Sequence, residues 1–301
     1  MKFFELKKLL LLLFYLISAF SLNASEGVHQ SAEKIGEILG FPITNSMVTS
    51  WVVSLVLILI IRLTVGKAKL IPGKGQLVIE SVIDSIRSII EPIVGKRVFF
   101  ASFWLLSGLF FFILINNLSG LLPGVGTIGT GYYDDDGHFH LNHYFIRPGN
   151  ADLNMTLALA LVANAVWAYI VLRHEKLGHI AHHVFGPKAT KKDVGPFFIP
   201  LAILFLAVGL IEVVSIMFRP VSLTFRLFGN VFGGESLLHS MFELGNILGL
   251  HETVTKVMAC FVPVPFYFME VLIGFVQALV FMLLVAVYIG LFTNHEEGKD
   301  H

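Results

Sequence analysis

The chain has 301 residues, of which 55% are hydrophobic and only 14% are charged, whereas soluble domains carry about 25% charged residues. This composition, with several long apolar segments, indicates a polytopic membrane protein and argues against a soluble enzyme. The formal net charge of +0 disfavours nucleic acid as a partner, and the single cysteine, Cys260, excludes an intramolecular disulfide and a cysteine metal site.

The N-terminal segment has a basic start, an apolar core from Leu9 to Phe20 and a small residue, Ala24, after it. This pattern is typical of a secretory signal peptide, and the core is short for a membrane span. Residues 1–24 are therefore expected to be a cleaved signal peptide or a retained N-terminal anchor. In both cases the chain after Ala24 emerges on the outer side, and residues 25–301 form a single membrane domain.

Three apolar spans follow, at 47–65, 99–122 and 153–172. Between the first two, residues 78–94 alternate apolar and charged residues at helical spacing, which predicts an interfacial helix. The segments 66–98 and 173–194 are rich in Lys and Arg, and basic loops mark the cytoplasmic side of a membrane. The polar segment 126–150, with three consecutive aspartates, is then expected outside.

The last hundred residues contain two apolar stretches that are too long for upright spans, at 197–250 and 254–292. As one helix the second would be about 60 Å long, roughly twice the thickness of the hydrocarbon core. We expect two long, strongly tilted helices packed as a hairpin, which returns the C-terminal tail to the cytoplasm. The predicted fold class is an all-α polytopic membrane protein with five transmembrane helices plus an interfacial helix.

Arg226 lies inside the first of these stretches, where a charge is least expected. A guanidinium at bilayer depth costs from roughly 3 to more than about 10 kcal/mol, and arginine cannot escape this cost by losing its proton. Its position therefore indicates that the protein moves charge across a membrane.

Helical spacing places further polar and small residues beside Arg226. At about 100° per residue, one stripe contains Arg226 together with Glu212, Ser215, Arg219, Asn230 and Gly233. Such a stripe lines a polar path, although a seam against a neighbouring helix, with Arg219 at the membrane surface, gives the same pattern. Gly229, Gly233 and Gly234 let another helix approach closely, either within this chain or from a partner.

Glu235 falls on the opposite side of that helix, and Glu270 and Gln277 share one face of the last helix. A hairpin brings Glu270 toward Glu235 and Gln277 toward Arg226. Two facing carboxylates at low dielectric raise each other's proton affinity, which suits proton relay. The alternative is that one carboxylate lies unpaired at the membrane surface.

Polar residues on the expected outer side form two further groups, and each group has more than one interpretation. Polar residues at the outer ends of spans cap helices or line an access funnel; these are Asn116, Asn117, Asp152 and Asn154. The histidines of the outer loop have loose spacing for a transition-metal site; these are His138, His140 and His143. No metal site is assigned to them, and no nucleotide-binding motif occurs.

The sequence from Arg219 to Glu235 (RPVSLTFRLFGNVFGGE) and from Gln277 to Tyr288 (QALVFMLLVAVY) resembles the signature of subunit a of F-type ATP synthases. Asn116 to Pro123 (NNLSGLLP) and Asp152 to Asn154 (DLN) are similar to its earlier motifs. The similarity runs from about Phe41 to Asn294.

The resemblance implies a non-catalytic stator subunit of the cell inner membrane, without cofactor or metal, beside a ring of c subunits and the b-subunit stalk. Arg226 then corresponds to the family's essential arginine. The outer half-channel corresponds to Asn230, Glu235, Glu270 and Gln277, with Asp152 and Asn154 near its opening, and the cytoplasmic one to Glu212, Ser215 and Arg219. The chain departs from some members at Gly120, where they have aspartate, and at Glu270, where they have histidine. The alternatives are a self-contained proton-coupled transporter and, from the His138 loop alone, a metal permease.

Overall fold

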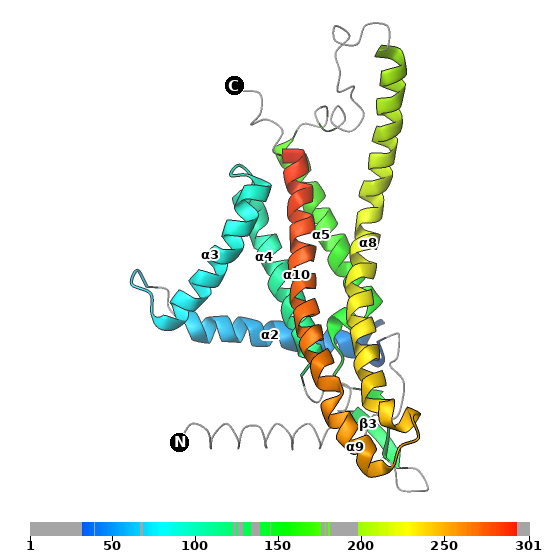
Figure 1. Ribbon diagram of the computed structural model, residues 1–301. Coiled ribbons are helices and arrows are strands. Elements are labelled where there is room, and N and C mark those ends of the chain that lie inside the picture. Colours follow the sequence, from blue (N-terminus) through cyan, green and yellow to red (C-terminus); the bar gives the residue numbers. More distant parts are fainter. Residues whose placement is uncertain are drawn as a thin grey trace. The chain divides into compact units, whose positions relative to one another are not determined.

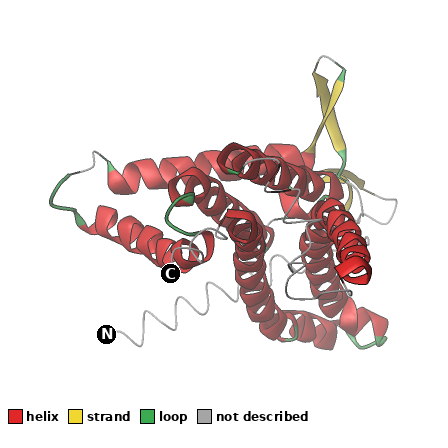
Figure 2. Ribbon diagram, turned by 90° about the horizontal axis from the view of Figure 1, so that it is seen from above, coloured by secondary structure: helices red, strands yellow, loops and turns green. Residues whose placement is uncertain are grey.

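The computed structural model describes residues 32–38, 40–66, 69–122, 129–133, 139–144, 146–175 and 198–293, and the single residues 125, 178 and 180. The expected signal peptide and the C-terminal tail lie outside these residues. Helices make up almost all of the described chain, and strands are confined to two short hairpins (Figure 2).

Five stretches of the described chain are long and apolar enough to cross a membrane. They are α2 (Asn45–Val65), α4 (Phe99–Gly120), α5 (Leu153–His174), α8 (Phe198–Ile247), and α9 (Glu252–Phe261) together with α10 (Pro263–Thr293). The five-helix fold class predicted from sequence is confirmed. The expected amphipathic helix is also present as α3 (Lys74–Val94), and its position on a membrane surface stays a prediction.

The helix α8 contains Pro220 and continues on both sides of it, and Figure 1 shows α8 as one long helix. Proline removes one backbone donor from a helix and commonly bends or breaks it, but Pro220 does not divide this span. Residues 254–292, by contrast, were expected to form one helix, whereas the structure separates α9 from α10 at Val262. Pro263 lacks the N–H that would continue the hydrogen-bond ladder, which accounts for the separation.

The two hairpins were not predicted. β1 (Lys34–Ile38) pairs antiparallel with β2 (Phe41–Thr44) around Gly40, whose φ is 82°. β3 (Gly129–Tyr133) pairs antiparallel with β4 (Phe139–Tyr144) inside the expected outer loop. Both are too short to change the all-helical class.

The described residues group into two compact units, each containing parts of several helices. The first takes its residues from Met1–Gly66, Phe111–Thr156 and Arg226–Leu279. Its interior is polar where α2 begins and α4 ends: Ser46, Ser50, Asn116 and Asn150 are at most 1% exposed. A buried polar interior of this kind requires hydrogen-bond partners, and these belong to the site described below.

The second unit takes its residues from Lys67–Phe110, Leu157–Phe225 and Val280–His301. Its interior is apolar, with Ile90 and Leu106 fully buried on α3 and α4. Arg97 ties the start of α4 to the end of α5, because its Nη1 lies 3.2 Å from Oε1 of Glu175 and its Nη2 donates to the His174 carbonyl.

Candidate functional site

Arg226 lies on the exposed side of α8, beside two glycines that have open space around them. Arg226, Gly229, Asn230 and Gly233 are all exposed, and a β-carbon at Gly229 or Gly233 would meet no atom within 4 Å. Within the described part of the chain the Arg226 guanidinium has no ion-pair partner. This face therefore presents an uncompensated charge next to a smooth surface that a second helix can approach.

Asn230 connects this stripe to α10. Its Nδ2 donates a hydrogen bond to Oε1 of Gln277 over 2.7 Å. Gln277 is 5% exposed, and its Nε2 has no hydrogen-bond partner among the described residues. Gln277 thus reaches the region of Arg226 through Asn230, which lies one turn further along α8.

Glu270 packs against the backbone of α8 at Gly234. A β-carbon at Gly234 would overlap the Glu270 carboxyl group, so this glycine, unlike its neighbour Gly233, makes room within the chain. The next residue, Glu235, has a buried Oε2 without a hydrogen-bond partner among the described residues. The charge of Arg147, from the segment before α5, acts on Glu235.

Asp152 caps α5 and also holds the start of α2. Its Oδ1 accepts the backbone N–H of Asn154 at 3.1 Å, and its Oδ2 accepts the Ser46 hydroxyl at 3.0 Å. Asp152 is 4% exposed, whereas Asn154 is exposed. The capping interpretation therefore describes the local geometry of Asp152, and its carboxylate is at the same time part of a buried polar network.

The same network continues from α4 to α10. Asn150 donates to Oδ1 of Asn117 over 2.7 Å, and Asn117 donates to the Gly274 carbonyl over 3.0 Å. Gly274 lies one turn before Gln277 on α10. Hydrogen-bonding side chains therefore extend from the segment before α5 to the backbone of α10, one turn before Gln277, all within the first unit.

In the second unit, Arg219 is held by aromatic rings. Its Cζ lies 4.0 Å from the centre of the Tyr288 ring and 5.4 Å from that of Trp167. The indole N–H of Trp167 donates to the Tyr288 carbonyl at 2.9 Å, which orients both rings. Guanidinium–ring contacts contribute about 0.5–2 kcal/mol, so Arg219 is fixed by α5 and α10 without a carboxylate at bonding distance among the described residues.

The other two residues of the cytoplasmic group precede Arg219 on α8. Glu212 is half-buried and interacts electrostatically with Arg219, and Ser215 is exposed. Helical spacing keeps them on one side of the helix with Arg219, as expected from the sequence.

Three contributors to the site were missed by sequence reasoning: Arg147, the Trp167–Tyr288 pair, and the specific role of Gly234. Arg147 is buried, and a basic residue that precedes a polar helix start was a signal that could have been followed. Trp167 and Tyr288 lie on different helices, so no regular spacing in the sequence indicates that their rings meet. The side chains of the His138 loop lie outside the described residues, so its role is untested.

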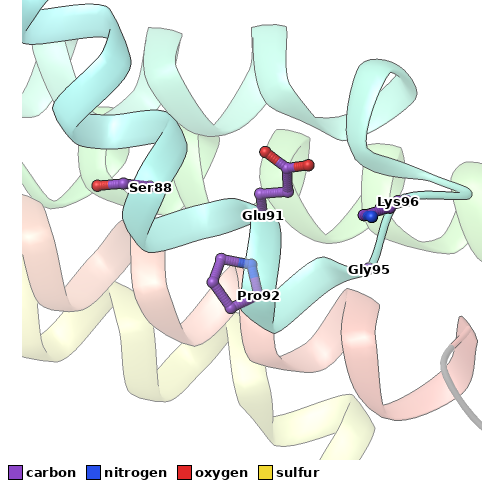
Figure 3. Close-up of a pocket in the computed structure, with 5 residues that line it drawn as sticks. All are labelled: Ser88, Glu91, Pro92, Gly95 and Lys96. Carbon is purple, nitrogen blue, oxygen red and sulfur yellow. The ribbon is translucent and has the colours of Figure 1, made fainter.

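A pocket of about 460 Å³ opens at the end of α3 and is lined by Ser88, Glu91, Pro92, Gly95 and Lys96 (Figure 3). Glu91 already pairs with Arg87, whose Nε lies 3.0 Å from Oε2. None of the predicted site residues lines this pocket.

The family model described as ATP synthase A chain matches residues 47–290. Among individual proteins, the chain is 33% identical to ATP synthase subunit a of Trichlorobacter lovleyi, over 81% of this chain and 85% of the relative. It is 30% identical to the proteins of the same name from Desulfotalea psychrophila and Desulfosudis oleivorans. These matches cover 83% and 85% of this chain, and 84% and 92% of the respective relatives.

Proposed function

This chain belongs to the ATP synthase subunit a family, and we propose that it is the stator subunit that conducts protons past a rotating c-ring. It is a multi-pass membrane protein. In this proposal it resides in the cell inner membrane with its C-terminus in the cytoplasm. It assembles with the c-ring, the b-subunit stalk and the remaining subunits, and it catalyses no reaction alone.

The exposed guanidinium of Arg226, which has no ion-pair partner among the described residues, is the observation that carries the proposal. A fixed cation in an apolar span is costly unless an anion meets it, and the described chain supplies none. The open surface at Gly229 and Gly233 supports close passage of a foreign helix. A c-ring helix that carries a carboxylate would supply the anion for Arg226 and would fit against the open surface at Gly229 and Gly233.

Two groups of polar residues serve as half-channels on either side of Arg226 along α8. The outer half-channel comprises Glu235, Glu270, Gln277 and Asn230, with Asp152 and Asn154 near its opening. The cytoplasmic half-channel comprises Glu212, Ser215 and Arg219. The hydrogen bonds from Asn150 through Asn117 to Gly274 support a polar lining for the outer path.

Rotation follows from where a ring carboxylate is neutral and where it is charged. A proton from the outer half-channel neutralises the carboxylate, which then travels through lipid. Near Arg226 the fixed positive charge favours the ionised form, so the proton leaves through the cytoplasmic half-channel. Each charge that crosses gains about 2.3 kcal/mol per 100 mV, and Arg226 blocks direct passage between the two paths.

Replacement of Arg226 tests the proposal. Arg226→Ala is expected to abolish ATP-driven proton pumping in membrane vesicles, because no fixed charge then forces proton release. Arg226→Lys is expected to lose most pumping, since an ammonium lacks the planar fork of the guanidinium and can lose its proton. Arg62→Ala, which removes an exposed arginine near the end of α2, is the control and retains pumping. Normal pumping by Arg226→Ala contradicts the proposal.

Cysteine chemistry tests the partner and the two paths in a Cys260→Ala background. Gly233→Cys is expected to cross-link to a c subunit, whereas a cysteine at buried Leu238 is not. Water-soluble thiol reagents are expected to reach Ser215→Cys from the cytoplasmic side and Glu235→Cys from the outer side. One continuous reactive path past Arg226 from a single side would favour a self-contained transporter.

A further inference from the structure

His239 is a partly buried titratable residue of α8 that the roles above do not use. Its ring is partly covered, and its Nε2 is buried without a hydrogen-bond partner among the described residues. Buried polar atoms in proteins are rarely left unpaired, and exceptions concentrate where a group exchanges protons or water. Histidine is also the side chain type that changes its charge between about pH 5 and 8.

The position of His239 connects it to Glu235. The two residues are one turn apart on α8, about 40° from each other around the axis, and side chains at this spacing are neighbours. Oε2 of Glu235 is likewise buried without a hydrogen-bond partner in the described part of the chain. Two adjacent buried groups, each able to hold a proton, therefore occupy one side of α8, away from Arg226.

α10 contacts α8 both before and after His239 along the chain. Before it, Glu270 packs against Gly234. After it, the ring of Phe242 lies 6.2 Å from the ring of Tyr267 in an edge-on contact. His239 therefore lies between two residues of α8 that contact α10, and its Nε2 is buried.

Charged and titratable groups near His239 come from α8 itself, from α10 and from the segment before α5. On α8 they are Glu235 and Glu243, and Glu243 accepts a hydrogen bond from Asn246 at 2.7 Å. α10 contributes Tyr267 and Glu270 to the same stretch, and Arg147 acts on Glu235. Among these groups Glu235, one turn from His239 on the same helix, is the carboxyl group placed to exchange a proton with the imidazole.

We propose that His239 is a further proton-carrying residue of the outer half-channel, which takes protons from the outer compartment and passes them to Glu235. An arriving proton forms an N–H bond on the imidazole, giving an imidazolium. That bond breaks as an O–H bond forms on the Glu235 carboxylate, and the neutral imidazole is restored. No other reactant is consumed. This inference rests on the proposed outer half-channel, which places the end of α8 beyond Glu235 nearest the outer surface.

Passive proton conduction through the membrane sector in proteoliposomes tests the proposal, with the pH of the outer-facing compartment varied. His239→Gln is expected to lower conduction by about tenfold or more, since a positioned acid–base group contributes about 10²–10⁴-fold to proton transfer. It is also expected to flatten the dependence on outer pH. His239→Glu, which keeps a group that binds a proton, restores conduction with a pH dependence moved toward acid. Rates are expressed per assembled complex, so a loss of assembly does not enter the comparison.

The control is His251→Gln, which replaces an exposed histidine at the start of α9 and is expected to conduct as the wild type does. Wild-type conduction and pH dependence in His239→Gln would overturn the inference. An equal loss in His239→Gln and His239→Glu would also overturn it, because that result indicates packing alone. Failure of the proposed function is recognised separately: wild-type proteoliposomes would then conduct no protons, or Arg226→Ala would still couple.

Discussion

The contact between Gly234 and Glu270 predicts that one added methyl group blocks proton uptake without unfolding the protein. In Gly234→Ala the new β-carbon would overlap the Glu270 carboxyl group. Carbon atoms in contact lie about 3.5–4.0 Å apart, so the carboxyl must withdraw by roughly 1 Å or more. The clashing atoms are the far end of a rotatable side chain, which can move without separating the helices.

The effects on stability and on conduction therefore differ. Overpacking typically costs about 1–3 kcal/mol, and alanine gains about 1 kcal/mol over glycine within a helix, so the net cost is about 0–2 kcal/mol. A displacement of about 1 Å at a reacting group can reduce a rate by about 100-fold. Proton pumping by Gly234→Ala is thus expected to fall by one to two orders of magnitude while the assembled complex remains intact on native gels.

Gly108→Ala on α4 is the matched control, because it makes the same change within a helix where a β-carbon meets nothing within 4 Å. It is expected to pump normally. Pumping at the wild-type rate in Gly234→Ala would refute the assigned position of the Glu270 carboxyl. Loss of assembled complex in Gly234→Ala alone would show instead that the contact is structural.

Two other contacts predict smaller effects. Tyr288→Leu removes the ring that contacts Arg219, so it is expected to lower the free energy of unfolding by about 0.5–2 kcal/mol and to slow proton pumping. Tyr288→Phe keeps the ring and is expected to behave as the wild type. Equal behaviour of the two variants in thermal unfolding and pumping would exclude the ring contact. Asp152→Ala removes both a helix cap and the acceptor of the Ser46 hydroxyl, so we expect the free energy of unfolding to fall by about 1–3 kcal/mol. Thermal unfolding in detergent measures this change, and Ser46→Ala is expected to lose less stability. An unchanged melting temperature in Asp152→Ala would contradict the described hydrogen bonds.

The sequence was sufficient for the helices and for the faces of α8, because both depend on local periodicity. Arg226, Gly233 and Asn230 share a face at about 100° per residue, and the structure places all three on the exposed side. Pro220 could be treated as a bend rather than an end, since a split span would have placed the tail outside. The functional roles of these residues stay predictions.

The sequence was insufficient where the outcome depends on the register between helices. Gly233 and Gly234 are the same residue type in adjacent positions, yet one faces open space and the other the Glu270 carboxyl. Only the pairing of α8 with α10 decides which is which. The contact of Arg219 with Tyr288 has the same origin.

The side of α8 that carries Arg226 has no carboxylate within one turn of it, so the guanidinium charge is not neutralised from that helix. Glu235 and His239 lie on the side opposite Arg226, and Glu235 is about 14 Å away along the axis. A carboxylate on the same side within one turn would be close enough to form an ion pair with Arg226. The guanidinium would then be satisfied within the chain and would exert little force on a passing ring carboxylate. Asn230 and Gln277, which bear no charge, form a hydrogen bond near Arg226 instead, so in the proposed mechanism the outer half-channel approaches Arg226 without neutralising it.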